Sequence, residues 1–175
     1  MFIGCACVLI AAAGFAADVP PLVRERLTAT NETHGSFTQT KRLASGEEFV
    51  SRGLWRIRPG VDFEWRITEP FDAVFWADQM KYIYSNEDEM VEKPLDELVG
   101  FEHFKDAGNG DFSAFFKAFD ALYKEDDDGF HVLAKPRDGR LAKFLTRVDA
   151  DGFPSNWLFR ATFPDATVFE VRIVE

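Results

Sequence analysis

Large apolar and polar side chains alternate along much of this chain with a period of two residues. The clearest case is Phe63, Trp65 and Ile67, which alternate with charged and hydroxyl-bearing residues. Successive side chains of a strand point to opposite faces, so this pattern predicts a sheet with one dry face and one polar face. Further strands are predicted at 37–41, 49–58, 74–77, 81–85, 130–135, 141–149, 156–163 and 167–174.

Short turn sequences separate the predicted strands. Pro59-Gly60, Asp151-Gly152 and Pro164-Asp165 are the clearest of these turn signals. Neighbouring strands that are joined by short turns pair in the antiparallel sense. The pattern therefore predicts a meandering antiparallel sheet of about nine strands.

The middle of the chain has helical spacing instead. Residues 94–106 carry apolar side chains three and four positions apart, and their first turn is acidic, which suits the helix dipole. A second helix is predicted at 111–122, with Asp111 as a candidate N-cap. Its aromatic stripe consists of Phe112, Phe115, Phe116 and Phe119. With a short helix at 22–30, the prediction is an α+β fold with a few helices on one face of the sheet.

The first seventeen residues carry no charge and form an apolar stretch. Gly14 and Ala16 supply the small residues that a signal peptidase requires, so residues 1–16 are predicted to be a signal peptide and 17–175 a single domain. The apolar stretch is shorter than the roughly 20 residues of a membrane span. The alternative interpretation is a buried N-terminal strand or helix.

The net charge and the positions of the cysteines limit the classes of function that the chain can have. The formal net charge is -10, which argues against nucleic acid as a partner and against adsorption to anionic lipid through a basic patch. Both cysteines, Cys5 and Cys7, fall in the predicted signal peptide, so no disulfide or thiolate site is expected after it. Aromatic residues make up 15% of the chain, and 19 of them are Phe, so large rings are expected to fill the interior.

No catalytic constellation is evident. His34, His103 and His131 are far apart and lack the spacing of metal ligands, and no nucleophile elbow, P-loop or zinc motif is present. The acidic run 125–128 lacks the alternating ligands and the glycine of a calcium loop, so it is interpreted as a solvated turn. The sequence therefore predicts a protein that is not an enzyme and that uses no metal and no cofactor.

Four short motifs occur in a fixed order between the first predicted helix and residue 70. They are Ser36-Phe37-Thr38-Gln39-Thr40, Gly53-Leu54-Trp55-Arg56-Ile57-Arg58-Pro59, Phe63-Glu64-Trp65 and Pro70. In this order and spacing, apart from about one extra residue after Pro59, the chain resembles the bacterial periplasmic lipoprotein carrier LolA and its LolA-like relatives. The strong match covers about 50 residues.

The resemblance implies an open, incomplete antiparallel β-barrel with a helical lid over an apolar cavity for acyl chains. It further implies a monomeric periplasmic carrier that receives acylated lipoproteins from an inner-membrane ABC-type complex and delivers them to an outer-membrane acceptor. The residues that match the cavity, or that the aromatic pattern adds to it, are Trp55, Phe63, Trp65, Ile67, Phe112, Phe115, Phe116 and Phe119. The matching arginine, Arg58, is implied to hold the lid closed.

Other interpretations stay open at this stage. A ring that faces a cavity and a ring that packs in a core give the same sequence pattern, and Arg58 also fits an ordinary surface charge. A lipid-sensing protein that regulates a partner would use the same fold, since fold does not determine function. A hydrolase of lipid-like substrates is the third alternative.

Overall fold

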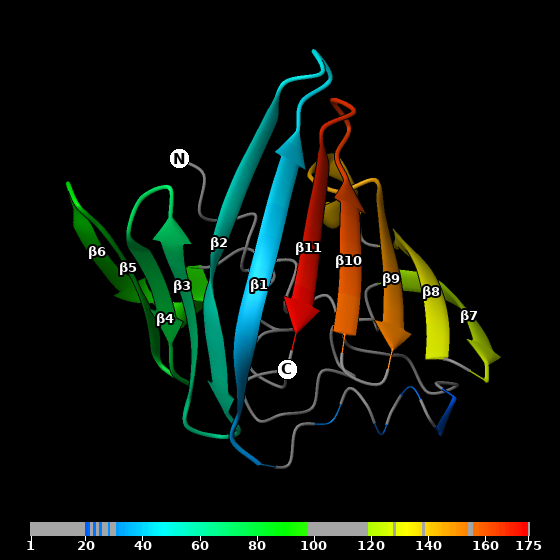
Figure 1. Cartoon of the computed structure of the whole chain (residues 1–175), viewed down its shortest axis with the longest axis horizontal. Coiled ribbons are helices and arrows are strands. Elements are labelled where there is room, and N and C mark those ends of the chain that lie inside the picture. Colours follow the sequence, from blue (N-terminus) through cyan, green and yellow to red (C-terminus); the bar gives the residue numbers. More distant parts are fainter. Residues whose placement is uncertain are drawn as a thin grey trace.

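The computed structural model describes Pro20, Pro21, Val23, Glu25, Thr28 and residues 31–97, 119–127, 129–137, 139–153 and 156–174. All eleven strands in this part of the chain belong to one antiparallel sheet (Figure 1). The strands are β1 (Thr33–Arg42), β2 (Glu48–Arg58), β3 (Asp62–Glu69), β4 (Ala73–Ala77), β5 (Lys81–Asn86), β6 (Met90–Pro94), β7 (Phe119–Asp126), β8 (Gly129–Pro136), β9 (Arg147–Phe153), β10 (Asn156–Thr162) and β11 (Val168–Val174).

The first and last strands meet in the middle of the sheet. The spatial order is β6-β5-β4-β3-β2-β1-β11-β10-β9-β8-β7, so β1 lies between β2 and β11. Phe37 of β1 pairs with Ile173 of β11, and the pairing continues from Ser36 to Arg42. The strands at the two ends, β6 and β7, do not pair with each other, so the sheet is open (Figure 1).

The cross-strand register places the large apolar side chains of the core cluster on one side of the sheet, and every strand except β6 contributes to them. We call this side the apolar face. Its members include Phe37, Trp55, Phe63, Trp65, Ile67, Phe75, Tyr82, Phe119, Tyr123, Phe130, Val132, Val148, Trp157, Phe159, Phe169, Val171 and Ile173. The alternation that the sequence predicted for Phe63, Trp65 and Ile67 is therefore confirmed and extends across the sheet.

The opposite face is more polar and carries ion pairs, although Leu54 and Trp76 also lie on it. Arg160 of β10 donates two hydrogen bonds to Glu170 of β11, its direct neighbour across the strands. Arg56 of β2 donates one hydrogen bond, at 3.2 Å, to Glu64, which faces it on β3. Opposite charges at facing positions stabilise strand pairs modestly, so this face supports the register without requiring a covering layer.

Gly53 lets β1, β2 and β3 approach closely. It faces Phe37 across the strands, and the register shifts between Arg52 and Gly53, as in a β-bulge. A Cβ at position 53 would lie 2.7 Å from Cζ of Phe37 and would overlap the carbonyl oxygen of Arg66. The ring of Phe37 covers the position that the missing side chain leaves open, and it stacks on Trp65 with centroids 3.6 Å apart.

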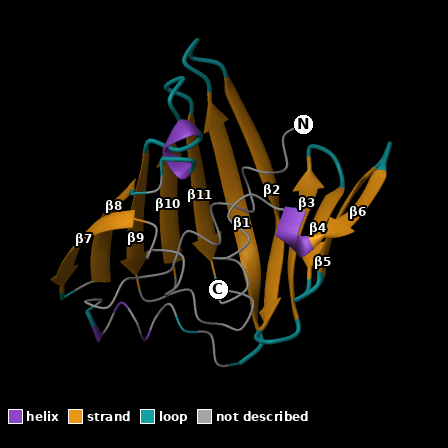
Figure 2. Cartoon of the chain, turned by 180° about the vertical axis from the view of Figure 1, so that it is seen from behind, coloured by secondary structure: helices purple, strands orange, loops and turns teal. Residues whose placement is uncertain are grey.

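Most of the predicted strands in the two halves are confirmed within one or two residues, but four predictions are wrong. The helix predicted at 111–122 extends too far toward its C-terminus, because Phe119–Asp126 is strand β7. The strand predicted at 141–149 begins with a three-residue 3-10 helix, η3 (Leu141–Lys143), near the end of the sheet where β9 begins (Figure 2). The turn predicted at Asp151-Gly152 lies inside β9.

The fourth error concerns β6 and the helix predicted at 94–106. Met90–Pro94 is a strand that the sequence analysis missed, and a 3-10 helix, η1 (Leu95–Glu97), follows it. The rest of that predicted helix lies outside the described residues, as do residues 111–118 and the predicted signal peptide. The helical residues of the described part are Pro21, Val23, Glu25 and these two short 3-10 helices, so a helical lid is not part of it.

Replacing Gly53 by alanine tests the close approach. We expect Gly53→Ala to lower the free energy of unfolding by about 1–3 kcal/mol, the usual cost of overpacking a filled site. The measurement is urea unfolding followed by circular dichroism. Gly139→Ala is the matched control, because a Cβ at position 139 meets nothing within 4 Å. A Gly53 variant as stable as the control would contradict the close approach described for β1, β2 and β3.

Candidate functional site

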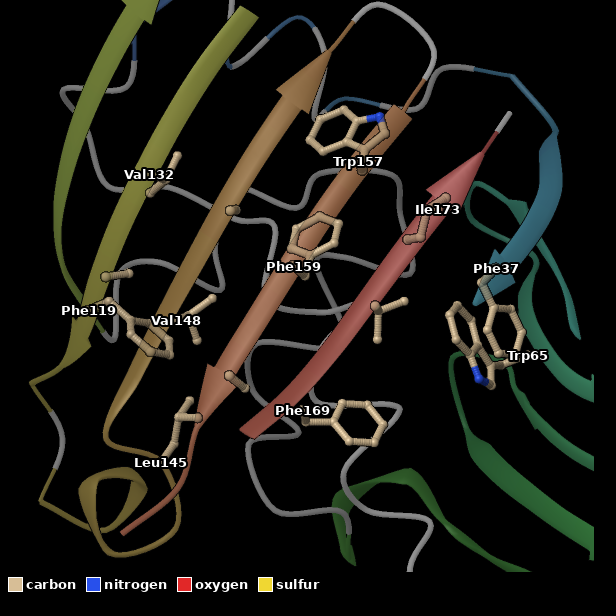
Figure 3. Close-up of a cluster of buried hydrophobic side chains, with 14 of the residues drawn as sticks. Phe37, Trp65, Phe119, Val132, Leu145, Val148, Trp157, Phe159, Phe169 and Ile173 are labelled. Carbon is tan, nitrogen blue, oxygen red and sulfur yellow. The ribbon is translucent and has the colours of Figure 1, made fainter. Parts of the chain in front are cut away.

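The apolar face contains two kinds of side chain. Trp65 is 1% exposed and Phe159 is 3% exposed, so both side chains are almost completely buried among their neighbours (Figure 3). Trp55, Phe63 and Tyr82, by contrast, are only partly buried although they pack against the same cluster. Side chains of the second kind keep area to offer to a ligand.

Ala121, Tyr123, Leu141 and Phe163 are partly buried on β7, in η3 and just after β10. The other four partly buried side chains lie on β2, β3 and β5, in the β2–β5 half of the sheet. Rings there form a continuous row, in which Phe63 lies 6.5 Å from Trp65 and 6.4 Å from Phe75, centroid to centroid. Phe75 in turn stacks on Tyr82 at 5.7 Å. Ile67 belongs to the same partly buried group. We call Trp55, Phe63, Ile67 and Tyr82 the open patch of the apolar face.

Three buried polar atoms on the apolar face have no hydrogen-bond partner in the described part of the chain. They are Nε1 of Trp55, Nε1 of Trp65 and Oε1 of Gln39. Trp55 and Trp65 face each other directly across β2 and β3. The amide nitrogen of Gln39 donates to the hydroxyl of Ser51 at 3.4 Å. The face is therefore apolar with a few unpaired polar groups.

Arg58 lies at the end of β2 and makes a two-pronged contact with Asp62. Its Nε donates a hydrogen bond to Oδ1 of Asp62 at 2.8 Å, and its Nη2 donates a second hydrogen bond to Oδ2. Nε1 of Trp76 also donates to Oδ2, at 3.1 Å. The Asp62 carboxylate is 3% exposed, whereas the Arg58 side chain is 40% exposed. By strand alternation, Arg58 and Asp62 belong to the polar side of the sheet, opposite the apolar face.

These contacts lower the pKa of Asp62 below its ordinary value of 3.8. The main cause is the pair of hydrogen bonds from Arg58, and the bond from Trp76 acts in the same direction, while burial opposes both. Asp62 therefore carries a full negative charge at neutral pH, and it joins the β2–β3 turn to β4 through Trp76.

Comparison with known proteins decides the family. A relative named outer-membrane lipoprotein carrier protein, from Sodalis glossinidius, is 31% identical over 153 residues, which cover 82% of this chain and 70% of the relative. The chain belongs to the outer-membrane lipoprotein carrier family. A relative of the same name from Salmonella typhi is 28% identical over 162 residues, which cover 87% of this chain and 75% of the relative.

The chain was also compared with solved structures and with family models. A solved structure of a LolA superfamily protein from Nitrosomonas europaea is 10% identical and has a TM-score of 0.44, with 97% of this chain and 91% of the other covered. No family model matches the chain. The resemblance that the four motifs indicated is thus confirmed by the curated carrier relatives.

The predicted site residues of this carrier-family chain fall into three groups. Trp55, Phe63, Trp65 and Ile67 come together on the apolar face, as predicted. Phe119 also reaches that face, but from strand β7 and with no exposure, so its assignment to a helical stripe is wrong. The other three rings, Phe112, Phe115 and Phe116, lie outside the described residues.

Sequence reasoning missed several residues of the site. Phe75 lies beside Phe63, and Tyr82 lies beside Phe75. Both are on strands that were themselves predicted, so extending the alternation to 74–77 and 81–85 would have found them. Asp62 was missed although it follows Arg58 by four residues, a spacing that brings two strand-end residues together across a tight turn. Arg58 remains predicted as the lid-holding residue, and its partners in the described part are as given above.

The described residues also bear on metal binding and on membrane insertion. Within the described ranges, no three or more His, Cys, Asp and Glu side chains gather in a way that could hold a metal ion. Among the helical residues that the structure places, no helix has the length and apolar character needed to cross a bilayer.

Asp62→Asn tests the buried carboxylate. At pH 7 we expect the free energy of unfolding to fall by about 1.5–3 kcal/mol, the range for hydrogen bonds to a charged group. A lowered folded-state pKa stabilises the fold above the unfolded-state value of 3.8 and loses that contribution as the pH falls through the lower folded-state pKa. The difference between wild type and variant should therefore shrink below about pH 4.

The measurement is urea unfolding at a series of pH values from 7 to 3. Asp72→Asn is the control, since Asp72 pairs with Arg66 at 3.7 Å but is 63% exposed. Exposed pairs contribute about 0–1 kcal/mol, so this variant should stay close to wild type. Equal losses in the two variants, or a loss at Asp62 that is the same at pH 7 and pH 3, would refute the assignment.

Proposed function

We propose that this protein is a periplasmic carrier that shields the acyl chains of lipoproteins, or of similar acylated cargo, and moves them from the inner to the outer membrane. The observation that carries the proposal is the open patch, a set of partly buried apolar side chains on one half of an open sheet. Membership of the carrier family supports the same conclusion.

The physical argument concerns the balance between loading and release. Each methylene that leaves water contributes about 0.8 kcal/mol, so covering part of one acyl chain is enough for useful affinity. A carrier must also let the chain go. Rings that are only partly buried, such as Phe63 and Tyr82, offer contact area on one side and are held in place on the other. Such rigid walls leave the packing around a flexible chain imperfect, which keeps the affinity moderate.

The proposal includes two membrane partners by analogy with the family. An ABC-type complex in the inner membrane would release the cargo, and an acceptor at the outer membrane would receive it. The alternative function is a lipid-sensing protein that regulates another protein on the same fold. The two differ in one measurable step, because a sensor binds acylated molecules without delivering them to a second membrane.

The experiment measures both extraction of the cargo from one membrane and its delivery to another. The purified protein is incubated with donor vesicles that hold a fluorescent acylated peptide, separated from them, and mixed with acceptor vesicles. We expect wild-type protein to extract the peptide and to deliver it. In Phe63→Glu the carboxylate would replace a ring of the open patch, and we expect at least about tenfold weaker extraction, since a charge against hydrocarbon is costly.

Leu54→Glu is the matched control. Leu54 is 55% exposed on the polar side of β2, where it pairs across the strands with Ser36 and Arg66. This variant introduces the same charge a few residues away on the opposite face, so it should extract and deliver like wild type. Equal loss in both variants would remove the open patch from the site. Extraction without delivery by the wild type would favour the sensor.

Arg58 is proposed to hold the lid closed in the empty carrier. If it does, Arg58→Leu should load cargo at least as well as wild type and should release it several-fold more slowly, because closure helps to expel the chains. Asp62→Asn is the comparison, because it weakens the contact between Arg58 and Asp62 and leaves the Arg58 side chain in place. Equal transfer defects in the two variants would mean that Arg58 acts through Asp62 alone, and the lid role would then be abandoned.

A further inference from the structure

The two unpaired indole N–H groups of the apolar face have a chemical consequence. Nε1 of Trp55 and Nε1 of Trp65 are both buried, and neither has an acceptor among the described residues. A buried donor without a partner loses its hydration and gains nothing in return, and this cost is the reason why such groups are rare. Trp65 is 1% exposed, so its N–H is shielded from bulk water in the empty protein.

The two donors occupy the same part of the sheet. Trp55 and Trp65 are direct cross-strand neighbours on β2 and β3, and their side chains share the apolar face. Side chains at facing positions of antiparallel strands have Cβ atoms about 5 Å apart. On the other side of Trp55, Gly35 of β1 provides the room for the indole, because a Cβ at position 35 would lie 2.8 Å from Nε1 of Trp55.

The surroundings decide which partner fits. Apolar side chains line the face around both indoles, among them the ring of Phe37 stacked on Trp65. An anionic or strongly hydrated group would lose its water there without compensation. A neutral acceptor attached to hydrocarbon fits, and the carbonyl oxygen of an acyl ester or amide has that chemistry. Oε1 of Gln39 is an acceptor itself, so it is not part of this subsite.

We propose that the indole N–H groups of Trp55 and Trp65 donate hydrogen bonds to carbonyl oxygens of ester- or amide-linked acyl chains in the cargo. This inference rests on the proposed carrier function and adds a specificity to it. The apolar face then recognises acyl groups and not merely hydrocarbon, because a plain alkyl chain leaves both donors unpaired. Selectivity of this kind arises from the penalty for unpaired buried groups.

The test compares two ligands that differ only in their carbonyl groups. Dioctanoylglycerol carries two ester carbonyls, and its dioctyl ether analogue carries none. Isothermal titration of the wild-type protein should give at least about fivefold tighter binding of the ester, as expected for a hydrogen bond in a buried site. The variants replace one tryptophan at a time by 3-benzothienylalanine, which keeps the two-ring shape and has no N–H.

At positions 55 and 65 this replacement should bring the ester affinity down toward that of the ether and leave the ether affinity unchanged. Trp76 is the matched control, since its N–H is already bonded to Asp62 on the other face. The replacement at position 76 should keep the ester preference and should lower the melting temperature by about 2–4 °C. At positions 55 and 65 the melting temperature of the empty protein should not fall.

Each result has a clear consequence. If wild type binds ester and ether equally, or if the preference survives at both positions, the inference fails while the carrier proposal stands. If the replacements at 55 and 65 destabilise the empty protein as much as the one at 76, the donors are already paired without cargo, and the inference fails. If neither ligand binds at all, the carrier proposal fails first and the inference with it.

Discussion

A single antiparallel sheet that carries large rings on one side exposes those rings to water unless something covers them. That constraint shapes this protein. Its eleven described strands form one open sheet, and the register brings rings from nine of them to the same side. The polar side is stable in water because facing charges such as Arg160 and Glu170 pair there. The other side must bury its rings, and each further Å² of apolar surface that it removes from water contributes about 25 cal/mol.

The first and last described strands, β1 and β11, pair with each other in the middle of the sheet. There the Phe37 ring covers Gly53 and stacks on Trp65, which ties β1, β2 and β3 together. From this centre toward β10 the side chains are fully buried, as Phe159 illustrates at 3% exposure. Toward β5 the rings of the open patch stay partly buried. The side chains of the open patch lie beside fully buried ones such as Phe75, so the apolar face mixes buried and partly buried rings.

The sequence predicted the periodic parts of the molecule well. Alternation alone placed Phe63, Trp65 and Ile67 on one face, and four motifs indicated the carrier family that the curated relatives confirm. It failed where periodicity is ambiguous. Phe119 stands at helical spacing from other rings and at strand spacing from Tyr123, and only pairing with β8 settles which period applies. Gly152 looks like a turn residue, yet it sits inside β9 because the ring of Phe130 fills the place of its side chain.

The sequence by itself determined the one-sided apolar sheet, the acidic charge and the family, because these follow from side-chain order and composition. Only the tertiary structure decided which rings are core and which remain accessible, since exposure depends on what lies across the strands. It also brought Arg58, Asp62 and Trp76 together from three strands and left two indole donors without partners among the described residues. A hydrogen bond depends on the positions of both the donor and the acceptor in space. The order of residues along the chain does not show which distant residues the fold brings together.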